Sequence, residues 1–331
     1  MKLTLRYDLR APEIGAPPAA LWAAAVEQCA WADRLGFDKV HIGEHHGAED
    51  GYCPSPLVLA GAVAGRTSSL RIHLSALVAV LHHPLRLAED MAVVDLLSGG
   101  RLDTTLGIGY RPHEYVMFGV DKRKRVPILE EIVEVLEKAW TGEPFDFRGT
   151  TVRVTPTPVQ KPRPPLYIGG STEASARRAA RLGDGYIPAE GNPTLWPTFE
   201  AECHRLGRPV PPRPAPRGPL FLHVSDDPER DWPIVAPHLI YTTRSYREWA
   251  TERGQGNTPY PELAGVDDLK ADPSFAVVTP DECVELARSL GDFSELTMQP
   301  LMGGLDPDVA WAGLELFESA VLPRLRAEGM R

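Results

Sequence analysis

The stretch that decides the fold spans residues 37–46 and reads Phe-Asp-Lys-Val-His-Ile-Gly-Glu-His-His. Residues 37–42 form a short, largely apolar run that predicts a buried strand. Glu44, His45 and His46 follow this strand almost at once. In a parallel β/α barrel the C-terminal ends of the strands form the active-site face, so this position predicts a functional role for these side chains.

Outward from this stretch, short strand-like runs alternate with longer helical patterns, which is typical of a parallel α/β fold. The predicted strands are Leu3–Tyr7, Lys39–Ile42, Arg71–Ala76, Asp103–Leu106, Leu166–Ile168, Gly185–Ile187, Leu220–Val224 and Glu295–Gln299. The predicted helices are Ala19–Leu35, Pro56–Arg66, Pro84–Leu97, Pro127–Trp140, Ser171–Leu182, Leu195–Leu206, Asp281–Leu290 and Asp306–Leu325. This order predicts a (β/α)8 TIM barrel made by a single domain over residues 1–331.

Two segments depart from a minimal barrel. Residues 145–154 predict a hairpin that turns at Gly149. Residues 225–279 are rich in Pro, Gly, Tyr and Arg and show weak periodicity, which predicts a long insertion before the last strand. Irregular segments of this length in compact domains are usually lids or binding loops, so we expect this segment to act as a lid.

Composition excludes several classes of protein. The 331 residues are 43% hydrophobic, enough for a large core, and the formal net charge of −10 argues against nucleic acid as a partner. The four cysteines show no CxxC spacing, which argues against a disulfide framework and a zinc ribbon. No apolar run reaches the roughly 18 residues that span a bilayer. The first residues also lack the apolar segment of a signal peptide, so we expect a cytoplasmic protein without membrane association.

Four groups of residues point to one family when taken in order and spacing. They are Arg34–Asp38 with Glu44–His46, His83–Asp90 running into Leu96–Leu102, Gly107–Tyr110 with Glu114, Phe118–Asp121 and Arg125, and Pro158–Pro165 with Tyr167–Ser171. Together they resemble the bacterial luciferase-like superfamily of flavin-dependent oxidoreductases, over about the first 190 residues. The resemblance implies a (β/α)8 barrel, a bound flavin and a homodimer.

The resemblance also assigns site residues. Glu44 and His45 are the predicted catalytic residues, with His45 as the base, because a histidine titrates near neutral pH and can take up a proton and return it. Ser75 and Ala76 stand where the superfamily carries a non-prolyl cis peptide behind the flavin ring. The predicted cofactor-binding residues are Ser75, Ala76, Gly107, Tyr110, Arg125, Gly169, Gly170, Ser171 and Ser175.

The phosphate of the flavin is expected at Gly169, Gly170 and Ser171, which end the fifth predicted strand and open a helix. Backbone N–H groups at a helix N-terminus form an anion site. Ser175 would add a hydroxyl group and Arg125 a charge-assisted hydrogen bond. By contrast, Asp90, Asp95 and Arg101 are interpreted as structural residues that form ion pairs at helix ends and at the base of the barrel.

The function implied by this resemblance is that of a monooxygenase. Reduced FMN, delivered by a separate flavin reductase, would react with O2 to give a C4a-(hydro)peroxyflavin that oxygenates a small organic substrate. Leu106 and Gly107 replace a reactive cysteine and a phosphate-binding arginine of luciferase, so light emission is not expected.

Three alternatives stay open. The first keeps the fold but uses the deazaflavin F420 for hydride transfer. The second is a metal-dependent barrel hydrolase with Glu44, His45 and His46 as ligands, although neighbouring residues on a strand point to opposite faces. The third is a flavin-binding homologue without catalytic activity.

Overall fold

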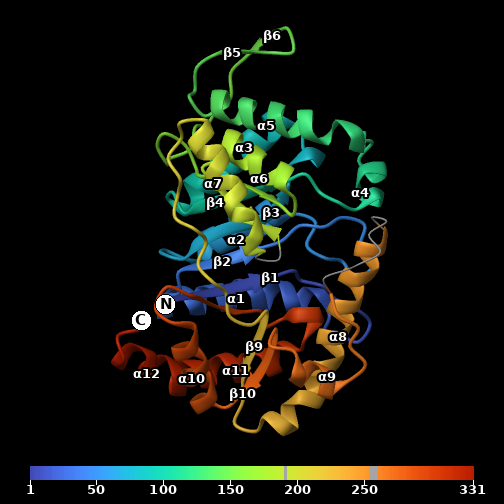
Figure 1. Ribbon diagram of the computed structural model, residues 1–331, viewed down its shortest axis with the longest axis vertical. Helices are drawn as coiled ribbons and strands as arrows, with labels where there is room; N and C mark the ends of the chain where they lie inside the picture. The colour runs from blue at the N-terminus through green and yellow to red at the C-terminus, as the bar shows by residue number, and fades with distance from the viewer. Residues whose placement is uncertain (190–191, 253–259) are drawn as a thin grey trace. The chain divides into compact units, whose positions relative to one another are not determined.

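The chain forms two compact units in the computed structural model, which describes residues 1–189, 192–252 and 260–331. Unit 1 consists of Met1–His41, His46–Pro54 and Ala215–Arg331, and unit 2 of Ile42–His45 and Ser55–Pro214. Each unit is described by itself, with the labels of Figure 1. None of the described helices is long and apolar enough to cross a membrane.

Unit 1 contains two groups of parallel strands. β11 (Glu295–Met298), β1 (Lys2–Tyr7) and β2 (Lys39–Ile42) are neighbours in that order, and Leu3 lies opposite Leu296. β9 (Phe221–Val224) and β10 (Phe275–Val278) form a separate parallel pair. The helices of unit 1 are α1 (Pro18–Leu35), α8 (Pro228–Glu252), α9 (Val266–Ala271), α10 (Pro280–Leu290), α11 (Pro307–Leu316) and α12 (Leu322–Ala327).

The segment 225–279 differs from the expected irregular loop. Its main element is α8, a helix of 25 residues, and it also holds α9 and β10, while residues 253–259 lie outside the described part. Pro233 and Pro237 lie inside α8, and because proline usually breaks a helix, the sequence pattern did not predict this helix. Packing compensates for them, since Trp232 and Leu239 of α8 belong to one buried apolar cluster with β9 and β10.

Unit 2 is built from four parallel strands with helical crossovers. The strands are β3 (Arg71–Val78), β4 (Leu102–Gly107), β7 (Leu166–Gly170) and β8 (Gly185–Pro188), paired in that order. The helices are α2 (Pro56–Arg66), α3 (Pro84–Ser98), α4 (Pro112–Met117), α5 (Arg125–Ala139), α6 (Glu173–Leu182) and α7 (Trp196–Arg205). The predicted hairpin is confirmed as β5 (Phe145–Phe147) and β6 (Thr150–Val152), which project beyond α5 in Figure 1.

The predicted α/β class with parallel strands is therefore confirmed, and each predicted strand occurs within two residues of its expected ends. The simple count of eight strands is not what the structure contains. β10 is a further parallel strand, and it lies inside the segment that sequence analysis treated as an insertion. Its four residues, Phe-Ala-Val-Val, are too short a run to separate from the weak pattern around them.

A buried ionisable pair joins β2 to β11 in unit 1. His41 Nε2 lies 2.8 Å from Glu295 Oε1, and Lys39 Nζ lies 3.7 Å from Glu295 Oε2. Burial lowers the pKa of His41 to about 4, the effect of Glu295 opposes this shift, and the positive charges of Arg217 and Lys39 add to it. His41 is therefore neutral in the folded protein at pH 7 and resists protonation as the pH falls.

This shift predicts a pH dependence of stability. An unfolded histidine has a pKa of about 6.5, so between pH 6.5 and 4 the unfolded chain binds a proton at His41 that the folded chain does not bind. The free energy of unfolding should therefore fall as the pH falls through this window, by up to about 1.4 kcal/mol per pH unit. His41→Gln, which keeps an N–H donor for Glu295 but cannot titrate, should lack this component. Urea unfolding at pH 7, 5.5 and 4.5 measures the difference, and parallel profiles for the two proteins would contradict it.

Candidate functional site

His45 is held by a carboxylate that sequence analysis did not pair with it. His45 follows β2, while Glu114 lies in α4, which begins just beyond the end of β4. His45 Nδ1 lies 2.8 Å from Glu114 Oε1, and Glu114 is fully buried. A carboxylate at Nδ1 fixes the tautomer that carries its proton there, so Nε2 is the nitrogen that can accept a proton.

Tyr110 lies on the other side of the His45 ring. Its hydroxyl oxygen is 3.3 Å from His45 Nε2, and the two rings meet edge to face with centroids 5.2 Å apart. The loop that carries Tyr110 is shaped by Gly109, whose φ of +68° suits glycine and whose added Cβ would meet Val78 Cγ1 at 2.8 Å. A larger residue at position 109 would move the loop away from β3.

Glu44 has a different set of contacts from its neighbour His45. Its Oε2 accepts a hydrogen bond from the backbone N–H of Val78 at 2.5 Å, and its Oε1 lies 2.9 Å from His82 Nε2. The side chain is buried and ties the end of β2 to the end of β3. These contacts anchor the loop that carries His45 to the end of β3, and the catalytic role of Glu44 stays a prediction. His46 is also buried, and it belongs to unit 1.

The two backbone segments that were expected to face the flavin, one on β3 and one on β4, lie close together. The Ser75–Ala76 peptide bond is cis, as the resemblance implied. A Cβ added to Gly107 would lie 3.3 Å from Ala76 Cβ, a tight contact, so the glycine favours the close approach of β4 to β3 here. The register between the two strands shifts between Ser75 and Leu77, beside the cis bond.

The end of β7 forms a tight turn into α6. Gly170 has a φ of +156°, and an added Cβ would lie 2.3 Å from Ser175 Cβ, so the backbone rests directly on Ser175. Ser175 Oγ accepts from the Thr172 N–H at 3.0 Å and Thr172 Oγ1 accepts from the Ser175 N–H at 3.2 Å, which together form a capping box. Ser175 Oγ also donates to Thr172 O at 2.6 Å. Tyr186 donates its hydroxyl to Gly170 O at 2.7 Å. The Ser175 hydroxyl thus shapes the turn, and the anion site expected there depends on the helix N-terminus and on nearby cations.

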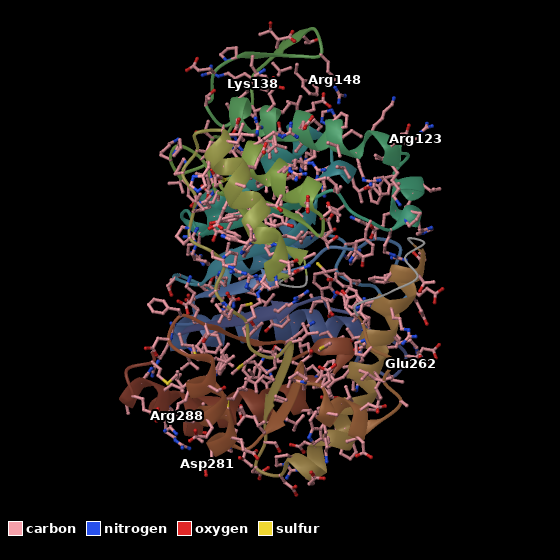
Figure 2. All side chains as sticks on the ribbon, viewed as in Figure 1. Arg123, Lys138, Arg148, Glu262, Asp281 and Arg288 are labelled. Atoms are coloured by element: carbon pink, nitrogen blue, oxygen red, sulfur yellow. The ribbon has the colours of Figure 1, made fainter. Side chains whose placement is uncertain are left out.

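Two arginines lie on the neighbouring elements α5 and α6, and only one of them, Arg125, was a predicted site residue. Arg125 begins α5 and donates to Lys122 O at 3.3 Å, whereas Arg123 points outward in Figure 2 and pairs with Asp121. Arg178 lies in α6 and is only 7% exposed. Burial lowers its pKa, and the positive charges of Arg181 and Arg125 add to the shift. The i, i+3 spacing from Ser175 was the signal that could have placed Arg178 on the same helix face.

The metal-hydrolase alternative finds no ligand set in the part of the chain that the structure describes. There, no three His, Cys, Asp or Glu side chains are grouped so that they could hold a metal ion. The contacts explain this, because Glu44 reaches β3 and His45 reaches α4.

The sequence pattern of the luciferase-like monooxygenase family matches residues 9–290. The chain belongs to this family. The match spans both units, and it includes the Glu44–His45 stretch and the turn between β7 and α6.

Relatives within reach of sequence comparison differ in their cofactors. The oxygenase component of a flavin-dependent trigonelline monooxygenase from Acinetobacter baylyi is 30% identical over 171 residues, covering 49% of this chain and 47% of that protein. An F420-dependent glucose-6-phosphate dehydrogenase from Nakamurella multipartita is 27% identical over 347 aligned positions, covering 97% of this chain and 96% of that protein. The chain spans about half the length of the first curated relatives that it matches.

A solved structure shares the fold over almost the whole chain. The oxygenating constituent of 3,6-diketocamphane monooxygenase from Pseudomonas putida, solved in complex with FMN, has a TM-score of 0.74 at 20% sequence identity and covers 98% of each chain. At this identity the likeness concerns the fold alone.

The contacts of Glu44 predict the result of replacing it. In Glu44→Ala the buried N–H of Val78 loses the acceptor at 2.5 Å, and the free energy of unfolding should fall by about 1–3 kcal/mol. Glu44→Gln should lose less, because its amide oxygen can still accept from Val78. His82→Ala is the control, since His82 is partly exposed and leaves the Val78 hydrogen bond intact. Urea unfolding measures all three, and equal stability of Glu44→Ala and the wild type would contradict the assignment.

Proposed function

We propose that this chain is a flavin-dependent monooxygenase that uses reduced FMN and O2 to oxygenate a small organic substrate. The observation that carries the proposal is the His45–Glu114 pair, with Nδ1 on the carboxylate and Nε2 beside the Tyr110 hydroxyl. Gly107 and the Ser75–Ala76 bond supply backbone on which a flat ring can rest.

The residues of this chain would transfer a proton and hold the His45 ring and its loop in position. His45 takes up a proton at Nε2 and returns it, while Glu114 stabilises the imidazolium charge and keeps the ring oriented. Tyr110 holds the Nε2 side of the ring, and Glu44 anchors the loop. Bound reduced FMN would supply the electrons for the reaction with oxygen.

The residues at the end of β7 fit a flavin that carries a phosphate. Gly170 leaves no room for a Cβ because the turn packs on Ser175, and this packing holds the backbone of the turn at the start of α6. Among the residues described by the structure, Arg178 Nε and Nη1 are buried without a hydrogen-bond partner. Gly169, Gly170 and Ser171 would therefore hold the phosphate, with Arg125 nearby.

A second candidate function is hydride transfer with the deazaflavin F420. It is supported by the F420-dependent relative, which aligns over 97% of this chain. The monooxygenase is supported by the trigonelline relative, an oxygenase component by name, which also supports a transient flavin reductase partner. A homodimer, and a lid role for residues 225–279, are further parts of the proposal.

Cofactor choice is tested by anaerobic titration of the purified protein with reduced FMN and, separately, with reduced F420. We expect tight binding of reduced FMN, followed by rapid reoxidation of the bound flavin when oxygen is added. Absorbance and stopped-flow fluorescence follow both steps. Selective binding of reduced F420 without a response to oxygen would replace the monooxygenase with the hydride-transfer enzyme.

The role of His45 predicts a separate effect on reactivity. His45→Gln should bind FMN within about threefold of the wild type, while reoxidation of bound reduced FMN slows by about 100-fold or more. The pH dependence of reoxidation near neutral pH should also disappear, because glutamine does not titrate. The matched control is His113→Gln, an exposed histidine on the same helix as Glu114. Unchanged rate and pH profile in His45→Gln would remove His45 from the mechanism.

A further inference from the structure

We propose that Arg6 binds the carboxylate of the substrate, so that the chain acts on an organic acid with one negative charge and an aromatic body. This inference rests on the proposed function and names the substrate class that the proposed function leaves open. All the residues that carry it belong to unit 1.

Arg6 lies near the carboxyl end of β1, on the face of the strand that points away from α1. Side chains alternate along a strand, so Thr4 and Arg6 share one face and Tyr7 lies on the other. The Tyr7 hydroxyl donates to Gln28 of α1 at 2.8 Å, whereas Thr4 contacts the Thr297 hydroxyl of β11 at 2.9 Å. Ligands of parallel α/β sheets bind outside the carboxyl ends of the strands, which is where Arg6 is placed.

Arg6 has no anionic partner of its own. In the part of the chain that the structure describes, it forms neither an ion pair nor a side-chain hydrogen bond. Asp8 follows two residues later on the same face, but its carboxylate is used by other groups. Its Oδ2 lies 3.7 Å from Arg10 Nε and accepts a hydrogen bond from Gln299 Nε2 at 3.1 Å. The positive charge of Arg6 is therefore left for an anion from outside the chain.

The donors of Arg6 are within reach of a ligand. Arg6 is half-buried, whereas Arg10 is fully buried. Among the described residues, the covered side-chain atoms without a hydrogen-bond partner include Nε and Nη2 of Arg10 but no atom of Arg6. The N–H groups of Arg6 thus lack a protein acceptor there and yet are not sealed, so they can exchange water for the oxygens of a ligand.

The surroundings keep Arg6 charged. Burial acts to lower the pKa of Arg6, but Tyr246, Tyr52 and Asp8 act in the opposite direction and the pKa is raised. Arg6 is therefore a cation throughout the physiological pH range. The same interactions bring its charge into the neighbourhood of two phenol groups, one that follows β2 and one on α8.

Tyr52 and Tyr246 are held in place by Arg10. The central carbon atom of Arg10 lies 4.9 Å from the Tyr52 ring, 4.8 Å from the Tyr246 ring and 4.3 Å from the Trp249 ring. Arg10 is fixed in turn by Asp50, whose Oδ2 accepts from Nη1 at 2.5 Å. The Tyr246 hydroxyl donates to the Tyr52 hydroxyl at 3.2 Å. Aromatic surface that is fixed in advance favours a flat apolar ligand, because little further order is needed on binding.

A carboxylate is the anion that suits these groups best. The planar guanidinium group binds the two oxygens of a carboxylate through parallel hydrogen bonds. One arginine balances one negative charge, and the carboxylate of Asp8 on the same face disfavours a ligand with two. A ring attached to the carboxylate would pack against Tyr52 and Tyr246. These features together favour an aryl carboxylate over a phosphate ester or a neutral aromatic compound.

Isothermal titration calorimetry tests the inference with pairs of ligands of similar shape. Benzoate, phenylacetate and 1-naphthoate are compared with their amides, which keep the ring and lack the charge, and the full chain is titrated with and without FMN. At least one acid should bind the wild type with a dissociation constant below about 1 mM. That acid should bind at least about 10-fold more tightly than its amide. Acetate should bind more weakly than the aryl acid, because it has no ring to pack on the tyrosines.

Variants of Arg6 give a second readout. Arg6→Gln should lower the affinity for the acid by about 10- to 100-fold and change the affinity for the amide by less than about threefold. Arg6→Lys should lie between the wild type and Arg6→Gln, because lysine keeps the charge but loses the planar fork. The matched control is Arg288→Gln in the same unit. Arg288 is exposed and paired with Glu328 at 2.6 Å, so this variant should change neither affinity.

The outcomes separate this inference from the proposed function. Equal affinity of the wild type for acids and amides overturns the inference, and so does a lack of binding of all three acids up to about 10 mM. Neither result needs a variant that folds. A loss in Arg288→Gln as large as in Arg6→Gln also overturns it. If FMN binds and is reoxidised by oxygen while the acids do not bind, the proposed function stands alone. If the acids bind through Arg6 and no flavin binds, the carboxylate site stands and the proposed function fails.

Discussion

A guanidinium group that is taken out of water must find acceptors for its five N–H donors, and this constraint governs three positions on which the molecule depends. Arg101 meets it with acceptors that lie in unit 2. Its donors reach the carbonyl oxygens of Ala64, Thr67, Leu70 and Ser98 and the hydroxyl of Thr67, at 2.6–3.2 Å. Arg101 thereby fixes the loop before β3 and the start of β4. These contacts fit the interpretation of Arg101 as a structural residue, and its expected ion pair stays a prediction.

Arg10 meets the same constraint only in part, in unit 1, because its buried Nε and Nη2 atoms have no hydrogen-bond partner among the described residues. Its Nη1 donates to Asp50 Oδ2 at 2.5 Å, and the rings of Tyr52, Tyr246 and Trp249 lie 4.3–4.9 Å from its central carbon atom. Aromatic faces attract a cation, so they partly replace the lost water. Tyr246 and Trp249 belong to α8, and this contact links the long helix to the chain that follows β1. Arg178 is the third case, and its buried Nε and Nη1 atoms likewise have no hydrogen-bond partner among the described residues.

The secondary-structure elements that depend on a local sequence pattern could be predicted from the sequence. Strands with apolar runs, helices with a proline in the first turn, and the turn from Gly170 into α6 all appear where the pattern put them. α8 could not be predicted, because Pro233 and Pro237 contradict local helix propensity and the compensation comes from distant packing. The contact between His45 and Glu114 could not be predicted from the sequence either, because 69 residues separate them and only the parallel arrangement of strand ends brings them together.

Glu44 and His45 have different contacts, and this difference supports the proposed role of His45 in proton transfer. They are neighbours in sequence, yet Glu44 turns to the Val78 N–H and His45 to Glu114. Side chains that diverge in this way do not converge on one metal ion. The divergence instead gives each a separate task, because Glu44 fixes the loop and Glu114 fixes the His45 ring. One ring nitrogen is then held by a buried carboxylate, and the other is left beside the Tyr110 hydroxyl, where a proton can be exchanged.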